Sequence, residues 1–114
     1  MTNSRSLEGK IAIVTGAGGG LGRCHALELA RQGAKVVVND LGHEAAGAVA
    51  KEIRDAGGEA IVAEGSVTDE QAVDAMVANT IETWGRIDIL INNAGILRDK
   101  SFAKMEIADF REVV

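Results

Sequence analysis

Four short runs of apolar residues, rich in β-branched side chains, are spaced along the chain. They are Ile11–Val14, Val36–Val38, Ile61–Ala63 and Ile87–Ile91. Continuous apolar runs of this length are typical of strands buried on both faces, as in a parallel sheet. Only Asp88 interrupts them, and we expect its carboxylate to bond backbone at a strand end.

Three segments with helical periodicity separate these runs, over 20–32, 45–53 and 73–84. In the last two, apolar side chains recur at spacings that gather them on one face of a helix. Thr68, with Gln71 three residues later, has the spacing of a capping box and is predicted to begin the third helix. Gly85 follows this helix and is the expected left-handed residue at its end.

This alternation of strands and helices predicts an α/β fold with three layers, a parallel sheet between two layers of helices. Right-handed crossovers place helices on both faces of the sheet. The expected strand order is 3-2-1-4, with the sheet ending after the fourth strand. No linker or repeat divides the chain, so residues 1–114 are expected to form a single domain.

The last segment, 104–114, has the pattern of another helix. Its apolar residues Ile107, Phe110, Val113 and Val114 can share one helical face. Because the chain stops inside this pattern, we expect the domain to be incomplete.

A glycine-rich turn, Thr15–Gly22, follows the first predicted strand and begins the first helix. Glycine lacks a Cβ atom, so the backbone can turn tightly and approach a pyrophosphate, which the N–H groups of the helix start then bind. This context predicts a dinucleotide site rather than a flexible loop, and the missing Gly-Lys-Ser/Thr excludes a P-loop. The predicted cofactor contacts are Gly16, Gly18, Gly19, Gly20, Leu21 and Gly22.

Asp40 stands at the end of the second strand, 20 residues after Gly20. A carboxylate here can accept hydrogen bonds from the adenosine ribose and repel the 2′-phosphate of NADP. Neither Gly19 nor Leu41, which we also place at the site, is basic, so NAD is favoured over NADP. The alternative is a turn residue in Asp40–Gly42.

Two amides, Asn92 and Asn93, end the fourth strand. A buried amide is costly unless it is paired, so these side chains must bond to backbone, to a cofactor or to both. Ala94 and Gly95 are small and leave room for a ribose or nicotinamide at the carboxyl end of the sheet, where ligands bind in such folds. The alternative is a pair of turn asparagines.

Together the motifs Thr15-Gly16-x-x-x-Gly20-x-Gly22 and Asn92-Asn93-Ala94-Gly95 resemble the short-chain dehydrogenase/reductase family, from Leu7 to Val114. The resemblance implies a Rossmann-like fold and NAD(P)-dependent oxidation of alcohols or reduction of ketones, commonly in a homo-oligomer. It also implies that Gly16, Gly20 and Gly22 shape the pyrophosphate site, that Asp40 binds the ribose and that Asn92–Gly95 border the cofactor.

Position 66 departs from the family pattern. Many members have Asp-Val after the third strand, with the carboxylate near the adenine, whereas this chain has Ser66-Val67. We retain both as cofactor contacts, because a serine hydroxyl also accepts hydrogen bonds. Stretches 38–42 and 95–102 are similar to the (3R)-hydroxyacyl-CoA dehydrogenase part of multifunctional β-oxidation enzymes, and bacterial 3-oxoacyl thioester reductases are similar here too.

The catalytic residues of the family are a serine, a tyrosine and a lysine, and this chain contains no tyrosine. We therefore assign no catalytic residue and expect the chain alone to be inactive, although the full-length protein is expected to be an oxidoreductase. Two alternatives remain: a non-catalytic dinucleotide-binding module, and an assembly piece that recruits a partner through the edge of its fourth strand.

Composition narrows the partners further. The net charge is −5 without a basic stripe, which argues against nucleic acid and anionic membranes as partners. No apolar run approaches a membrane span and the polar N-terminus is not a secretory signal, so a cytoplasmic protein is expected. The single cysteine, Cys24, is expected to be a buried thiol and allows no disulfide or metal cluster.

Overall fold

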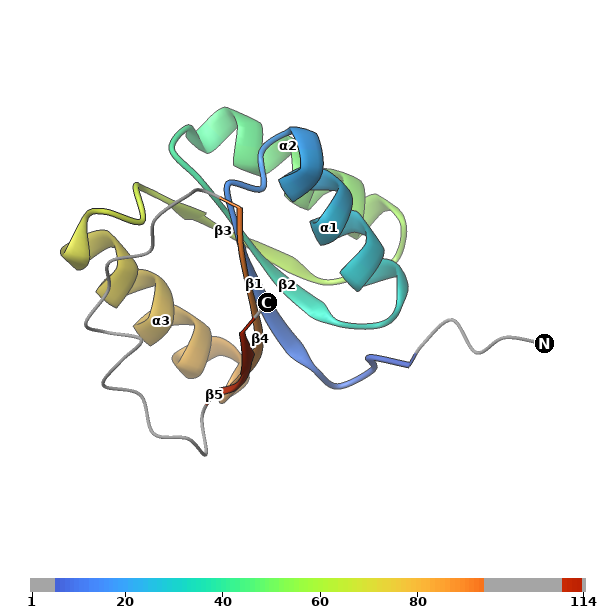
Figure 1. Cartoon of the computed structure of the whole chain (residues 1–114). Coiled ribbons are helices and arrows are strands. Elements are labelled where there is room, and N and C mark those ends of the chain that lie inside the picture. Colours follow the sequence, from blue (N-terminus) through green and yellow to red (C-terminus); the bar gives the residue numbers. More distant parts are fainter. Residues whose placement is uncertain (1–5, 94–109, 114) are drawn as a thin grey trace.

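The computed structural model describes residues 6–93 and the backbone of 110–113. Within these residues, parallel strands form one sheet in the order β3-β2-β1-β4-β5 (Figure 1). The strands are β1 (Ile11–Thr15), β2 (Lys35–Asp40), β3 (Ala60–Glu64), β4 (Ile87–Asn92) and β5 (Phe110–Val113). The helices are α1 (Gly20–Arg31), α2 (His43–Asp55) and α3 (Glu70–Trp84). The predicted fold class, the first four strands, their order and the three helices are confirmed.

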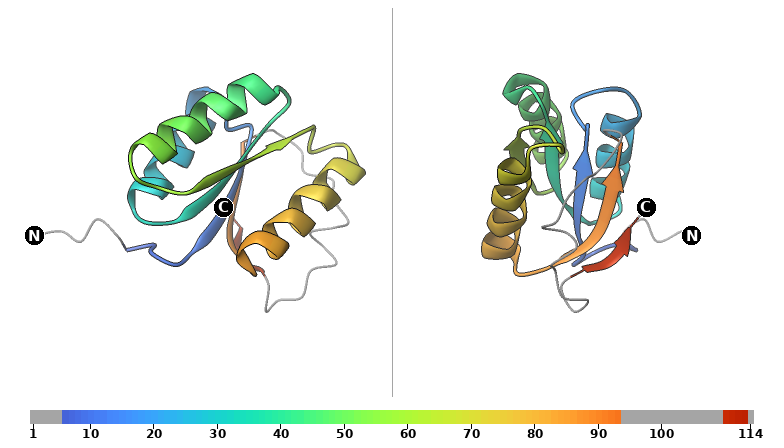
Figure 2. Two further views of the ribbon diagram at one scale, coloured as in Figure 1. Left: turned by 180° about the vertical axis from the view of Figure 1, so that it is seen from behind. Right: turned by 60° about the vertical axis from the view of Figure 1, so that its left-hand side comes forward.

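The direction of the crossovers decides which face each helix covers. From β1 the chain moves through α1 to β2 and through α2 to β3, in the same direction across the sheet. It then returns past β1 through α3 to β4. Because such crossovers are right-handed, α1 and α2 cover one face and α3 covers the other, as the left view of Figure 2 shows. None of these three described helices is long and apolar enough to cross a membrane.

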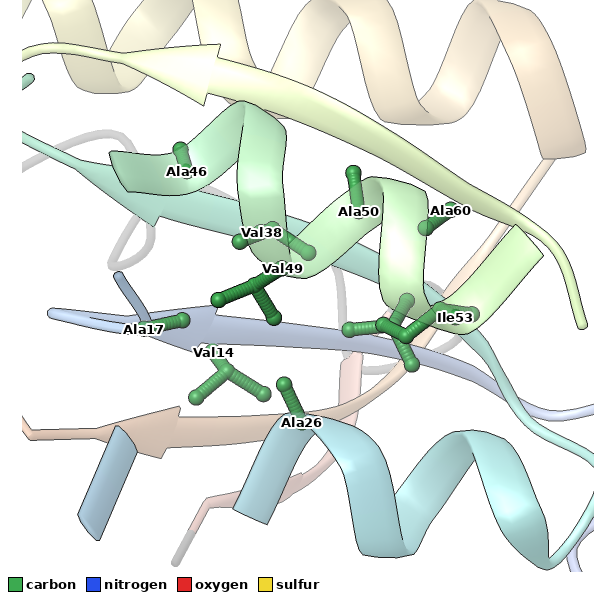
Figure 3. Packing of buried hydrophobic residues seen from close by; sticks show 10 residues of the cluster. Val14, Ala17, Ala26, Val38, Ala46, Val49, Ala50, Ile53 and Ala60 are labelled. Atoms are coloured by element: carbon green, nitrogen blue, oxygen red, sulfur yellow. The ribbon is translucent and has the colours of Figure 1, made fainter. Parts of the chain in front are cut away.

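Alternating side chains of the strands build a separate core on each face. Val14 and Val38 pack with Ala26 of α1 and Val49 of α2 (Figure 3). Ile13 and Val37, their neighbours in the chain, point to the opposite face and join the core under α3. This core also contains Val73, Met76, Ile87 and Leu90. Burial on both faces explains why the strands are continuous apolar runs.

At the C-terminal end, the helix predicted over 104–114 is wrong for Phe110–Val113. These residues form β5, which pairs in parallel with β4 along Ile87↔Phe110, Ile89↔Glu112 and Leu90↔Val113. The physical reason is the outer edge of β4, whose backbone N–H and C=O groups need partners that a helix cannot supply. The strand therefore continues the sheet beyond the fourth strand, where we expected it to end. The other residues of that predicted helix, 104–109 and 114, lie outside the described part of the chain.

The start of α3 also differs from the prediction. Asp69, not Thr68, is the N-cap, and its Oδ1 accepts hydrogen bonds from the N–H groups of Gln71 at 3.0 Å and Ala72 at 3.3 Å. A carboxylate at this place is also favoured by the positive end of the helix dipole. At the other end, Gly85 has φ 85°, so the predicted left-handed cap is confirmed.

Helix α1 presents a narrow face to the sheet. Its buried residues are Gly22 and Ala26, four residues apart, so Cys24 between them points outward. Cys24 is exposed, and the prediction of a buried thiol is wrong. On the side facing α2, Arg23 forms an ion pair with Glu52, at 2.9 Å through Nε and 2.5 Å through Nη2. This contact lowers the pKa of the Glu52 carboxyl and raises the pKa of the Arg23 guanidinium.

Candidate functional site

The carboxyl ends of β1 and β4 mark the point where the chain switches from one face of the sheet to the other. In open parallel sheets, ligands bind in the crevice at such a point. Beside it lies a cavity of about 260 Å³ between the ends of β2 and β3. Its lining residues are Gly16, Asn39, Asp40, Leu41, Gly65, Ser66, Val67 and Thr68. The fold therefore brings together five of the residues predicted from the sequence: Gly16, Asp40, Leu41, Ser66 and Val67.

The glycine turn connects this cavity to α1. Gly16 and Gly20 have φ angles of 61° and 56°, in the left-handed region that other residues rarely adopt. Gly19 is the N-cap of α1 and has no side chain that could occupy the N–H groups of the first helical turn. N–H groups at such a helix start can bind an anion, and binding of a pyrophosphate here stays a prediction. Leu21, on the same turn, is 71% exposed.

Gly22 allows α1 to approach the turn closely. A Cβ atom on Gly22 would lie 2.0 Å from the carbonyl oxygen of Gly16 and 2.9 Å from the Cα atom of Ala17. Both obstacles are backbone atoms, which cannot rotate away. The third glycine of the motif is therefore required by packing, and the close approach sets the position of the helix start over the turn.

Asp40 holds two segments of the site. Its Oδ1 accepts a hydrogen bond from the Leu41 N–H, and its Oδ2 accepts one from the Gly18 N–H, both at 2.7 Å. The first contact is the local turn that the sequence offers as the alternative role of Asp40. The second spans 22 residues and connects the end of β2 to the glycine turn. Asp40 is thus a turn residue and also a carboxylate at the cavity wall.

Thr15 connects the glycine turn to the end of β4, and the predicted site residues did not include it. Its side chain is fully buried. Oγ1 donates to Oδ1 of Asn92 at 2.8 Å and accepts from the N–H of Asn93 at 3.0 Å. The sequence indicated this role by a hydroxyl directly after the apolar run Ile11–Val14, where a buried polar group needs a hydrogen-bond partner.

We predict that Thr15→Val destabilises the chain by about 1–3 kcal/mol, because the half-buried N–H of Asn93 loses its acceptor. Thr15→Ser is the matched control, since it keeps the oxygen and removes only a methyl group. Urea unfolding followed by circular dichroism compares the two variants. Equal losses in both would mean that packing, not the hydrogen bond, holds the two segments together.

Asn39 is a second residue that the predicted site did not include. It is 4% exposed, and its Nδ2 donates to the carbonyl oxygens of Ala63 at 2.9 Å and Gly65 at 3.1 Å. It thereby fixes the segment after β3 that forms one wall of the cavity. An asparagine at the end of an apolar strand was the available signal, but the sequence does not show which neighbouring strand accepts its hydrogen bonds.

Asn93 differs from Asn39 in an informative way. Its Nδ2 is buried and has no hydrogen-bond partner among the described residues. A buried donor without a partner costs about 1–3 kcal/mol of folding stability. A bound ligand that placed an acceptor here, at the carboxyl end of β4, would remove this cost. Ala94 and Gly95, which we also predicted at the site, lie outside the described residues.

The segment after β3 forms the last wall of the cavity. The hydroxyl of Ser66 lies 2.7 Å from that of Thr68 and accepts the Thr68 N–H at 3.1 Å. This local turn explains why Thr68 does not cap α3. Val67 is buried. Within the described residues, no group of three or more His, Cys, Asp or Glu side chains is placed to hold a metal ion.

Comparison with known proteins gives several relatives. The chain is 46% identical to the peroxisomal hydratase-dehydrogenase-epimerase of Saccharomyces cerevisiae, over 100% of this chain and 13% of that protein. It is 43% identical to the 3-oxoacyl-[acyl-carrier-protein] reductase of a Synechocystis species, over 96% of this chain and 44% of that protein. The chain therefore spans less than half the length of these relatives.

A solved structure, 7α-hydroxysteroid dehydrogenase in complex with NADH and 7-oxo glycochenodeoxycholic acid, has a similar fold. The TM-score is 0.74 at 43% identity, with 79% of this chain and 35% of that chain covered. At this level of identity the likeness concerns the sequence as well as the fold. It supports the binding of a nicotinamide cofactor but does not distinguish NAD from NADP.

The names of the relatives overturn the predicted location. The yeast relative and three others, from Dictyostelium discoideum, Drosophila melanogaster and Mus musculus, are named as peroxisomal enzymes. These names point to the peroxisome, so the prediction of a cytoplasmic protein is wrong. It rested on the lack of an N-terminal secretory signal, and that argument does not address import into other compartments.

The family itself follows from a match along nearly the whole chain. The model of the short chain dehydrogenase family matches residues 10–114. This range includes the glycine turn, Asp40 and the two amides at the end of β4, which the fold brings together at the carboxyl end of the sheet. The chain belongs to the short-chain dehydrogenase family.

Proposed function

We propose that this chain is the cofactor-binding part of an NAD-dependent oxidoreductase that acts on a secondary alcohol or ketone. One observation carries the proposal: an uncapped helix start, a carboxylate and a buried amide without a partner among the described residues lie together at the carboxyl end of the sheet. These groups match the pyrophosphate, ribose hydroxyls and further acceptors of a dinucleotide. The fit is therefore one of complementary donors and acceptors.

Each part of the cofactor has a proposed set of residues. Gly16, Gly18, Gly19, Gly20, Leu21 and Gly22 would hold the pyrophosphate. Asp40, Leu41, Ser66 and Val67 would surround the adenosine in the cavity. Asn93, Ala94 and Gly95 would border the nicotinamide half. When bound, the cofactor supplies the group that accepts or donates hydride. The residues of this chain bind and orient it.

The preference for NAD over NADP rests on charge. Asp40 stands at the cavity wall, and Glu64 precedes the segment that forms the opposite wall. The nearby base His43 lies 3.6 Å from Glu64, so its side chain faces a carboxylate. A 2′-phosphate would therefore meet negative charge, whereas ribose hydroxyls would meet acceptors.

For the substrate, we propose a small-molecule 3-hydroxyacyl or 3-oxoacyl thioester. The relatives named for hydratase-dehydrogenase-epimerase and 3-oxoacyl-[acyl-carrier-protein] reductase activity support this class. The chain has no tyrosine to exchange the alcohol proton, so these residues alone would bind cofactor without turnover. We propose that the active protein is a homo-oligomer and needs neither nucleic acid nor membrane, in keeping with its acidic charge.

A cofactor titration tests the proposal. We expect NADH to bind this chain at least about tenfold more tightly than NADPH, a difference of about 1.4 kcal/mol. Calorimetry measures both affinities, and an absorbance assay for NADH with a 3-hydroxyacyl thioester should give no turnover. Failure of the folded chain to bind NADH would contradict the proposal. Turnover by the pure chain would contradict the assignment of catalysis to residues outside it.

The function of an assembly piece is less well supported. That alternative required a bare edge on β4, open to a strand of a partner. In the structure, β5 pairs along this edge. A clean monomer in light scattering at high concentration would count further against it.

A further inference from the structure

The carboxylate of Asp40 is held by one backbone N–H on each oxygen. The contact with Leu41 is local, but the contact with Gly18 reaches from β2 to the turn between β1 and α1. Hydrogen bonds from N–H groups to a carboxylate are shorter and stronger than neutral ones, and the distance of 2.7 Å fits this class. The orientation of the Asp40 side chain therefore depends on the position of the Gly18 backbone.

The space beside Gly18 explains why this position carries no side chain. A Cβ atom there would lie 2.7 Å from Oδ2 of Asp40 and 2.7 Å from Cβ of Ala45. The φ angle of Gly18 is not positive, so its backbone does not demand glycine. Gly19, the next residue, has open space around it and extended backbone with φ −173°. The two neighbouring glycines therefore differ, and only Gly18 is confined by Asp40.

We propose that Gly18 is a positioning residue that sets the choice between NAD and NADP through Asp40. The inference rests on the proposed function, in which Asp40 binds the adenosine ribose. The Gly18 N–H orients the carboxylate, and the missing Cβ leaves it room. Because the side chain is already fixed, little freedom is lost when ribose hydroxyls bind. The same fixed charge repels a 2′-phosphate.

The same hydrogen bond also holds the glycine turn in place, because the Gly18 N–H binds to the Asp40 carboxylate. Asp40→Ala would free the Gly18 N–H as well as remove the negative charge. This substitution should therefore weaken the binding of NADH without creating tight binding of NADPH. Asp40→Asn keeps the shape and one acceptor oxygen, which can still accept from the Gly18 N–H while the Leu41 N–H loses its acceptor. It should therefore retain the turn and narrow the difference between the two cofactors.

A double-mutant cycle on the full chain tests the coupling. We expect Gly18→Ala to weaken NADH binding by about tenfold and to reduce the preference over NADPH. In an Asp40→Ala background the same substitution should have a much smaller effect, because the contact that it disturbs is gone. Ala45→Gly, introduced into every variant, removes the other steric contact of position 18. With Ala45→Gly present, the double-mutant cycle can still be measured if the Gly18→Ala variant alone fails to fold.

Two further variants separate this role from general effects of glycine. Gly47→Ala lies on α2 in open space and should leave both affinities unchanged. Gly19→Ala lies on the same turn without contacting Asp40, so its effect should simply add to that of Asp40→Ala. A Gly18→Ala variant that keeps the wild-type ratio of NADH to NADPH affinity, or that adds to Asp40→Ala in the same way, would overturn the inference.

Hydrogen exchange of the Gly18 amide gives a measurement without cofactor. We expect slow exchange in the wild-type chain and in Asp40→Asn, and fast exchange in Asp40→Ala. A Gly18 amide that exchanges fast in the wild type overturns the inference even if NADH binds. A protected amide in a chain that binds no NADH refutes the proposed function, and the specificity role with it, but leaves the contact established.

Discussion

Gly22→Ala is expected to destabilise the fold by about 3 kcal/mol and to remove the proposed cofactor binding, because it forces apart two backbone segments. The added Cβ would meet the Gly16 carbonyl oxygen at 2.0 Å, and no side chain is there to move aside. Helix α1 would have to shift away from the sheet, and its N–H groups would shift with it. Chemical denaturation measures the loss of stability, and calorimetry with NADH measures the loss of binding.

Gly47→Ala is the matched control for this prediction. It makes the same chemical change in a helix, with nothing within 4 Å of the added Cβ. Because alanine is the better helix former, it should stabilise the chain by about 0.5–1 kcal/mol. A Gly22→Ala variant that unfolds at the wild-type urea concentration would show that the turn can relax without cost, and would contradict the packing argument.

The sheet could be predicted from the sequence because its strands are buried on both faces. Ile11–Val14 and Val36–Val38 are continuous apolar runs only because alternate residues enter two different cores. The right-handedness of the crossovers then predicted helices on both faces of the sheet. Element ends were less certain: Thr68 and Asp69 are both good caps, and only the hydrogen bonds to Gln71 and Ala72 distinguish them.

The error at Phe110–Val113 has a different origin. Apolar residues three and four residues apart fit a helix, but a four-residue strand needs no such pattern when the edge of β4 supplies its hydrogen bonds. Tertiary pairing therefore outweighed local periodicity. The error at Cys24 was avoidable, because Gly22 and Ala26 already define the buried face of α1 and position 24 lies away from it.

Part of the candidate site was predictable as a set of residues, but its contacts were not. Gly16, Asp40 and Ser66 were identified by their place after strands, and the fold brings them to one cavity. The hydrogen bond between Asp40 and Gly18 spans two loops, and sequence spacing does not show it. The same holds for Thr15, whose partners on β4 depend on the register of two strands that are distant in the chain.

Asp88→Ala is expected to cost about 3 kcal/mol, because a half-buried ion pair and a buried backbone hydrogen bond are lost together. Asp88 is 2% exposed and interrupts the apolar run of β4. As the sequence predicted, it bonds backbone: Oδ2 accepts the Ile11 N–H at 2.9 Å, at the start of β1. Oδ1 accepts the Arg86 guanidinium at 2.9 Å through Nε. The carboxylate therefore connects β1 to β4 at the amino end of these strands, opposite the proposed cofactor site.

Two further variants show how much of this loss of stability comes from the ion pair and how much from the backbone hydrogen bond. Asp88→Asn keeps an acceptor for the Ile11 N–H but loses the charge that pairs with Arg86, so its loss should be smaller than that of Asp88→Ala. Asp74→Ala removes an exposed carboxylate from α3 and should change stability by less than about 0.5 kcal/mol. Urea unfolding at neutral pH measures all three variants. If Asp88→Ala fell within the range of Asp74→Ala, the contact would be incidental, and the pairing of β1 with β4 would not depend on it.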